Sequence, residues 1–315
     1  MIITRLTGGL GNQMFQYAIA RKFLKKGNEK VFLDTSLLLT KEEEDIEKIY
    51  QRPFALDIFK NLKAKVDEKK ISGILKDESL ISKIKRKLFY RSCTVVEQEL
   101  MEWIEIPSSI HTSTNILFKG LFQSERFFKT IRKELLTDFT FPGMDFKNNL
   151  VKEKIFATPG AVSIHIRRGD YLSSSNKNIF NSVNMDYYDR SIEILDKKAN
   201  EESLTGFVFT DDIGWAQQNF SAQGKLDLHF VAGNHGKDSW KDMALMSACT
   251  HHIIANSSFS WWGAWLAEQG GINLAPRHWY MPGSYKFNIA DIIPQDWIVV
   301  DYCFNQEKNY TKDIA

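Results

Sequence analysis

The stretch AVSIHIRRGD, from Ala161 to Asp170, decides the fold of the second half of the chain, because it joins an apolar strand to a charged end. Alternation with a period of two puts the aliphatic side chains on one face, and His165 and Arg167 project together from the other. Arg168 leaves on the opposite side, and Gly169 permits a sharp turn. Parallel sheets bind ligands at the carboxyl ends of their strands, so this strand end is a candidate binding site.

Strand-like and helix-like segments alternate from this stretch to the end of the chain. The apolar runs typical of strands are 161–167, 206–210, 226–231, 252–255 and 272–275. The segments with apolar residues three or four apart, typical of helices, are 186–198, 213–220, 239–249 and 258–268. This succession predicts a parallel sheet that is covered by helices and joined by right-handed crossovers.

The first half begins in the same way, and the whole length exceeds one comfortable core. Its predicted elements are a strand at 2–6, a helix at 14–26, strands at 31–34 and 116–122, and a helix at 124–136; the strand order within 40–110 is not readable. With 315 residues, two domains of about 150 residues each are expected. Proline and glycine at 142–143 and 159–160 place the boundary near residue 155, giving domains 1–155 and 156–315.

Composition excludes several classes of protein. A formal charge of +2 lacks the strongly basic domain of a nucleic-acid binder. Cys93, Cys249 and Cys303 form no CxxC pair, so we expect neither a disulfide framework nor a thiolate zinc site. The chain opens on a strand-like run rather than a signal peptide, and no apolar segment has the length of a membrane span, so we expect a cytoplasmic protein.

The segment ISKIKRKLFYR, from Ile81 to Arg91, mixes five basic residues with apolar ones. A peripheral contact with an anionic membrane and a plain solvated helix are both open interpretations.

Arg167 is the leading candidate for an anion ligand. A guanidinium group can hold a phosphate through paired hydrogen bonds and stays charged when half buried. A structural ion pair between the arginine and Asp170 is the alternative. Asp211 and Asp212 end the next predicted strand, where a carboxylate can accept hydrogen bonds from a guanine edge or a ribose hydroxyl. An N-cap for the helix that begins at Ile213 is the alternative there. No aspartate-any-aspartate pattern occurs in the chain, so no metal site is predicted.

Two further segments lie between a strand and a helix. Asn256, Ser257 and Ser258 combine hydroxyls with backbone N–H groups that suit an anion, although capping alone also explains them. Three tryptophans follow, for which core packing and sugar stacking are both open. The loop LTGGLGNQMFQYA, from Leu6 to Ala18, matches neither the dinucleotide nor the Walker pattern. Its glycines, Gly8, Gly9 and Gly11, imply close backbone approach, and Asn12 stands where it can reach a polar ligand.

These pieces, in this order, resemble the bacterial α-1,2-fucosyltransferases of glycosyltransferase family 11. The matching segments are RLTGGLGNQMFQYA from Arg5, GLFQSERFF from Gly120, HIRRGDY from His165, FTDD from Phe209 and NSSFSWWGAWL from Asn256. The resemblance implies a GT-B fold of two facing Rossmann-like α/β domains with parallel sheets. It also implies transfer of L-fucose from GDP-β-L-fucose to the 2-hydroxyl of a terminal β-galactose in a glycan, with inversion and without a metal, in a bacterial pathway such as lipopolysaccharide O-antigen biosynthesis.

The resemblance also implies roles for single residues, and it leaves alternatives open. Arg167 would contact the donor diphosphate, and Asp170 is the carboxylate best placed by motif to act as base. The aspartates would lie by the guanosine, the serines on phosphate oxygens, and Asn12 by the fucose or pyrophosphate. The implied donor-binding residues are Gly11, Asn12, His165, Asp211, Asp212, Asn256, Ser257 and Ser258. A fucosyltransferase of another linkage or acceptor, and a non-catalytic GDP- or glycan-binding module, remain as alternatives.

Overall fold

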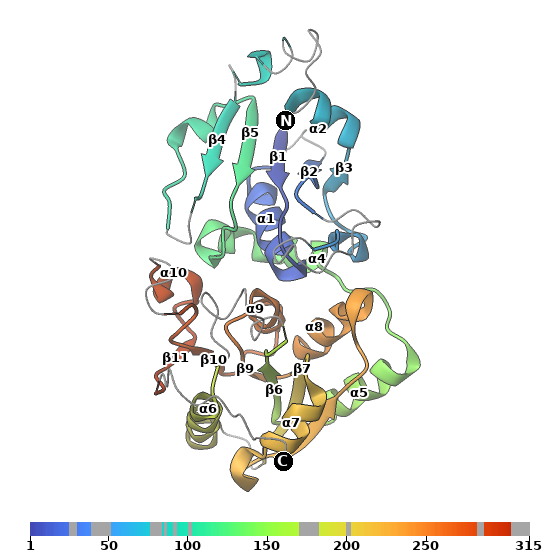
Figure 1. Ribbon diagram of the computed structural model, residues 1–315, viewed down its shortest axis with the longest axis vertical. Helices are drawn as coiled ribbons and strands as arrows, with labels where there is room; N and C mark the ends of the chain where they lie inside the picture. The colour runs from blue at the N-terminus through green and yellow to red at the C-terminus, as the bar shows by residue number, and fades with distance from the viewer. Residues whose placement is uncertain are drawn as a thin grey trace, which may run out of the picture.

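Two lobes, each built on one parallel sheet, make up the fold of this computed structural model (Figure 1). The structure describes residues 1–24, 30–38, 52–75, 84, 87–90, 93–99, 103–169, 183–199, 203–281 and 287–303. Asp170 therefore lies outside the described residues, as does most of the basic segment 81–91. The expectation of an α/β protein with two parallel sheets is confirmed.

The first lobe contains a five-stranded sheet in the order β3-β2-β1-β5-β4. Its strands are β1 (Ile2–Arg5), β2 (Val31–Asp34), β3 (Ala64–Val66), β4 (Cys93–Glu97) and β5 (Asn115–Lys119). Its helices are α1 (Leu10–Lys22), α2 (Glu68–Leu75) and α4 (Arg132–Asp138). Strands β3 and β4 fall in the part of the chain where no strand order is readable from the sequence. All the described pairs in this sheet are parallel.

The second lobe contains a six-stranded sheet in the order β11-β10-β9-β6-β7-β8. Its strands are β6 (Ala161–Ile166), β7 (Thr205–Thr210), β8 (Asp227–Val231), β9 (His251–Ile253), β10 (Asn273–Pro276) and β11 (Ile298–Val300). Its helices are α5 (Phe146–Phe156), α6 (Met185–Lys198), α7 (Ile213–Asn219), α8 (Trp240–Met246), α9 (Ser258–Trp265) and α10 (Ile289–Ile292). All five predicted strands are present, and β11, α5 and α10 are additional.

The predicted helix over residues 124–136 is only partly correct. The chain makes 3₁₀ turns at Glu125–Phe127 and Lys129–Ile131 before α4 begins. The two adjacent phenylalanines explain the irregular backbone, because each must enter a different part of the core. Phe127 packs on Phe122, whereas Phe128 stacks on Trp262 of the other lobe.

The predicted alternation of β6 is confirmed. Val162, Ile164 and Ile166 are buried in one hydrophobic cluster together with Tyr187 and Tyr188 of α6. The opposite face is buried too, because the sheet carries helices on both sides, as parallel sheets require.

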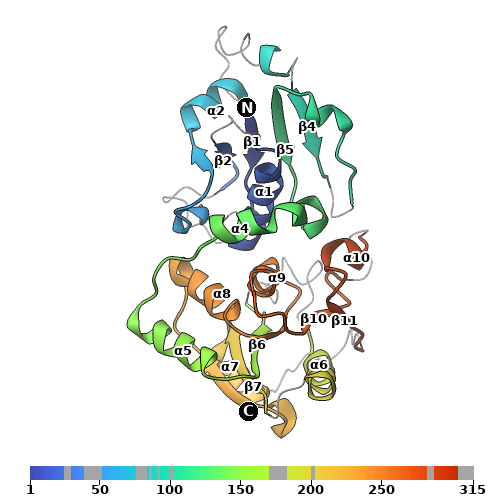
Figure 2. The same ribbon diagram turned by 180° about the vertical axis from the view of Figure 1, so that it is seen from behind.

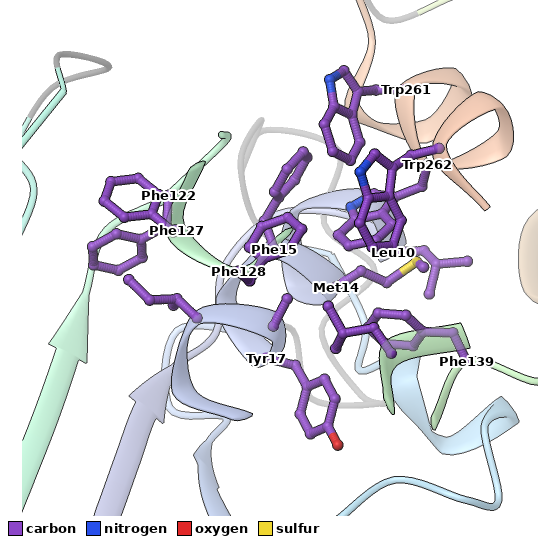
Figure 3. Packing of buried hydrophobic residues seen from close by; sticks show 14 of the residues in the cluster. Leu10, Met14, Phe15, Tyr17, Phe122, Phe127, Phe128, Phe139, Trp261 and Trp262 are labelled. Carbon is purple, nitrogen blue, oxygen red and sulfur yellow. The ribbon is translucent and has the colours of Figure 1, made fainter. Parts of the chain in front are cut away.

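The two lobes meet where α1 packs against α9 (Figures 1 and 2). Phe15 of α1 contacts Trp261 and Trp262 of α9, with ring centroids 4.5 and 4.9 Å apart (Figure 3). One hydrophobic cluster contains residues of both lobes, including the three tryptophans, all of them buried. Core packing therefore accounts for these tryptophans, and the sugar-stacking alternative is wrong for them.

Candidate active site

Arg167 and Asp211 meet at the carboxyl ends of the neighbouring strands β6 and β7. The guanidinium Nη1 lies 2.9 Å from the Asp211 carboxylate, and the backbone N–H of Arg168 donates to the same carboxylate at 2.9 Å. The arginine therefore has an ion pair with Asp211, and Asp170, the partner considered from the sequence, lies outside the described residues. With 29% of its side chain exposed, Arg167 stays within reach of a ligand at this edge.

Position 169 must be glycine, because its backbone packs directly against the Asp211 carboxylate. A Cβ atom at this position would lie 2.7 Å from Asp211 Oδ2, well inside van der Waals contact. The glycine thus lets the loop close over Asp211, which in turn fixes the start of the loop through the Arg168 amide.

The Arg168 side chain has other partners than that of Arg167, as expected for neighbouring residues that point to opposite sides of the strand. Its guanidinium carbon lies 3.6 Å from the centroid of the Trp215 ring, and its Nε lies 3.4 Å from Asp212 Oδ2. Asp212 also caps α7, because its Oδ1 accepts a hydrogen bond from the Trp215 amide at 3.1 Å. The N-cap alternative is therefore correct for Asp212, whereas Asp211 makes the contact with Arg167.

His165 lies buried beneath this edge, with 4% of its surface exposed. Burial, and secondarily the positive charge of Arg167, lower the pKa of His165 to about 3, so the imidazole is neutral at physiological pH. Within the part of the chain that the structure describes, its Nδ1 has no hydrogen-bond partner. A neutral ring can exchange hydrogen bonds with a ligand but contributes no positive charge.

The start of α9 brings the predicted serines to the junction of the lobes. Ser257 is the N-cap, and its Oγ accepts a hydrogen bond from the Phe259 amide at 3.3 Å. Ser258 Oγ donates to Asn12 Oδ1 at 2.7 Å, which joins the two lobes. Asn256 is buried and donates from its amide to the carbonyl of Trp279 at 2.9 Å, so this amide holds a loop of its own lobe.

The three glycines of the first loop differ in whether the structure requires glycine at their positions. A Cβ on Gly11 would lie 2.6 Å from the carbonyl carbon and oxygen of Ser258, and the Gly11 carbonyl accepts from Trp262 Nε1 at 3.0 Å. Gly8 has a φ of 72°, a conformation that favours glycine. Gly9 has no atom within 4 Å of such a Cβ, so the expected close approach is wrong for it.

Gln123 is a site residue that the sequence reasoning missed. Its Nε2 donates to Asn12 Oδ1 at 2.8 Å, so Asn12 accepts hydrogen bonds from both Gln123 and Ser258. Gln123 lies in the segment GLFQSERFF that was matched to the family, but nothing in its spacing distinguishes it from its neighbours. The three residues come from chain segments more than 100 positions apart and meet only in the folded protein.

The chemistry of the site is that of anion binding at strand ends. Among the residues that the structure describes, no group of three or more His, Cys, Asp or Glu side chains is arranged to hold a metal ion. The same residues include no helix long and apolar enough to span a membrane. Two facing α/β lobes, each built on one parallel sheet, are the arrangement of the GT-B class of fold.

The comparison with known proteins gives the family. The sequence pattern of glycosyl transferase family 11 matches residues 1–301, so the chain belongs to this family and is a glycosyltransferase. It is 33% identical over 305 residues to an alpha-1,2-colitosyltransferase of Escherichia coli, covering 96% of this chain and 99% of the relative. It is 28% identical over 300 residues to the O-antigen biosynthesis glycosyltransferase WbnK of Escherichia coli, covering 87% and 93%.

More distant similarities lie among fucosyltransferases. Galactoside alpha-(1,2)-fucosyltransferase 1 of Saimiri sciureus is 26% identical over 217 residues, which is 65% of this chain and 58% of the relative. Among solved structures, NodZ alpha-1,6-fucosyltransferase soaked with GDP-fucose has a TM-score of 0.43 and 13% identity, covering 84% of this chain and 92% of that one.

Proposed function

We propose that this family 11 glycosyltransferase transfers L-fucose from GDP-β-L-fucose to the 2-hydroxyl of a terminal β-galactose in a glycan, giving a Fucα1-2Gal product. The observation that carries the proposal is the full-length relationship to a transferase whose name specifies an α-1,2 linkage. The fucosyltransferase relative, matched over a shorter stretch, has a galactoside acceptor in its name. A galactoside 2-fucosyltransferase would have the α-1,2 linkage named for the first relative and the galactoside acceptor named for the second.

The role of Arg167 follows from the charge that develops during transfer. Cleavage of the bond between fucose and GDP leaves negative charge on the β-phosphate, and a preformed guanidinium stabilises that charge. We assign the second lobe, which includes α5, to the donor, with Ser257 and Ser258 on the phosphates and His165 nearby as a neutral ring. Asp211 then shares Arg167 with the diphosphate and, with Asp212 and Asn256, lies on the guanosine side.

The acceptor is assigned to the first lobe, with Gly11 and Asn12 facing the donor. The galactose 2-hydroxyl attacks the anomeric carbon from the face opposite GDP, which inverts the configuration. Asp170 takes the proton of that hydroxyl as general base. No step in this scheme uses a metal ion or another cofactor.

A second donor is favoured by one observation. The relative at 33% identity is named for transfer of colitose, which is fucose without its 3-hydroxyl. GDP-colitose is therefore the alternative donor to compare with GDP-fucose. We place the reaction in the cytoplasm at the inner face of the membrane, which agrees with an O-antigen enzyme among the relatives and with the basic segment at 81–91.

The direct test incubates the enzyme with GDP-fucose or GDP-colitose and lactose, with and without EDTA, and determines the linkage of the product by NMR. We expect an α-1,2 product from GDP-fucose that EDTA does not reduce. Another linkage, loss of activity in EDTA, or GDP binding without transfer would contradict the proposal.

The Arg167→Ala variant should lose about 100- to 1000-fold in kcat, the usual effect of removing one such donor. Arg190→Ala is the matched control, because Arg190 pairs with Asp186 at 2.9 Å on the exposed face of α6. Both variants are checked for folding by circular dichroism. Equal activity in the two would reject the role of Arg167.

A further inference from the structure

The segment that follows β5 has a strained backbone. Phe122 has a φ of 51°, in the left-handed region, which is rare for a bulky residue and costs on the order of 1–3 kcal/mol. Gln98 fixes this conformation, since its Oε1 accepts from the Phe122 amide at 2.7 Å. Gly120 packs so closely on Gln98 that a Cβ there would lie 2.7 Å from Gln98 Cβ. The protein thus maintains an unfavourable turn at this position.

The turn sends Gln123 to the junction of the two lobes. Its side-chain amide nitrogen reaches Asn12, which is also hydrogen-bonded to Ser258 at the start of α9. Only 8% of the surface of Gln123 is exposed, so its carboxamide is placed in the interface between the lobes.

Two buried polar atoms of this segment have no hydrogen-bond partner among the described residues. Across the described ranges, neither Gln123 Oε1 nor Ser124 Oγ has a hydrogen-bond partner, and both atoms are buried. Leaving such an atom unsatisfied costs about 1–3 kcal/mol. The cost comes in addition to the strain at Phe122, and both fall on consecutive residues beside the candidate site. A ligand that supplies a hydroxyl group would remove the cost at Gln123.

We infer that the carboxamide of Gln123 binds a hydroxyl group of the transferred sugar and thereby helps to select the donor. This inference rests on the proposed function. The phosphates are assigned to Arg167 and the α9 serines, so a sugar attached to them lies toward Asn12 and Gln123. A turn of the carboxamide about its last bond, which is a soft torsion, presents its oxygen to the sugar. The oxygen then accepts a hydrogen bond that the sugar hydroxyl donates.

The test compares donors that lack single hydroxyls. GDP-fucose and its 2-deoxy, 3-deoxy and 4-deoxy analogues are assayed with wild type and with Gln123→Leu, which is close in size and has no polar atom. We expect wild type to lose at least about tenfold in kcat/KM with one deoxy donor, the value of one hydrogen bond. Gln123→Leu should lose a similar factor with GDP-fucose and lose nothing further with that same deoxy donor.

Gln269→Leu is the control, because this glutamine also donates a hydrogen bond from its side-chain amide, to the backbone carbonyl of Ala248 at 3.0 Å, but is exposed on the second lobe. An equal loss by Gln123→Leu on all four donors, no loss on GDP-fucose, or equal use of all four donors by wild type would overturn the inference. If Gln123→Leu does not fold, Gln123→Asn, which shortens the side chain by one carbon, is measured in its place with the same criteria. The 3-deoxy donor of this series is GDP-colitose itself. If wild type uses it but not GDP-fucose, the proposed donor is wrong, and analogues of GDP-colitose that also lack the 2- or 4-hydroxyl still test Gln123.

Discussion

Replacing Gly11 with alanine tests the contact that joins the two lobes. The new Cβ would lie 2.6 Å from the Ser258 carbonyl group, whereas ordinary contact begins at 3.4 Å, so α1 and α9 must move apart by most of an ångström. The obstacle is backbone and cannot rotate away. The shift also weakens the bonds from Trp262 to the Gly11 carbonyl and from Ser258 to Asn12.

The expected magnitude combines three effects. Overpacking costs about 1–3 kcal/mol, and each weakened hydrogen bond costs about 1 kcal/mol. Alanine regains about 1 kcal/mol, because Gly11 lies within a helix. We therefore expect Gly11→Ala to lower the free energy of unfolding by about 2–4 kcal/mol.

Gly9→Ala is the control in the same loop. Gly9 is the N-cap of α1 with a φ of −78°, and a Cβ there meets no atom within 4 Å. Gly9→Ala should lower the free energy of unfolding by less than about 1 kcal/mol. Both variants are measured by urea unfolding followed by tryptophan fluorescence, which reports directly on the buried Trp261 and Trp262. Equal stability of the two variants would refute the reasoning.

Three further predictions follow from the site and the core. Gly169→Ala should reduce the rate of transfer at least about tenfold with little change in stability, because the new Cβ displaces Asp211 and with it Arg167. Gly214→Ala is the control, because a Cβ at Gly214 meets no atom within 4 Å. Kinetics and melting temperature are measured for both variants. Asp138→Asn should cost about 3 kcal/mol in urea unfolding, because the buried carboxylate accepts from Tyr17 at 2.6 Å and Arg21 at 2.7 Å, whereas Asp301→Asn in the exposed pair with Arg277 should cost under about 1 kcal/mol. Burial lowers the pKa of both His165 and His252 to about 3, below the usual 6.5. Below pH 6.5 the unfolded chain therefore binds more protons than the folded protein, and the free energy of unfolding decreases as the pH is lowered. The loss between pH 7.5 and 5 should be about 2 kcal/mol for each histidine, and a His252→Asn variant with an unchanged slope would contradict this.

The second lobe was predictable because its signals are local. Each strand there is a short apolar run followed by an amphipathic helix, and period-two alternation places the side chains of β6 correctly. Strands β3 and β4 were not predicted from the sequence, because they are short and partly exposed and so have no continuous apolar run. Only pairing with the inner strands β2 and β5 defines them, and pairing depends on residues far apart in the chain.

The site was predictable at the level of residue types but not of partners. The sequence indicates that Arg167 and Asp211 lie at strand ends, since both follow predicted strands. It does not show that Asp211 pairs with Arg167 while Asp212 caps α7, because adjacent carboxylates differ only in side-chain direction. Gln123 depends on a left-handed residue at Phe122, and no sequence pattern predicts that conformation for phenylalanine.

The junction of the lobes bears on how the enzyme binds its donor. Asn12 and Ser258 are hydrogen-bonded to each other, and the aromatic residues of α1 and α9 form one buried core (Figure 3). Separating the lobes would expose Trp261, Trp262 and Phe15 to water, at about 1.5–3 kcal/mol or more for each large side chain. The glycine loop is therefore held against the start of α9 in the second lobe by these contacts. Groups that are held in place in this way stabilise developing charge without a cost of reorganisation at the moment of transfer.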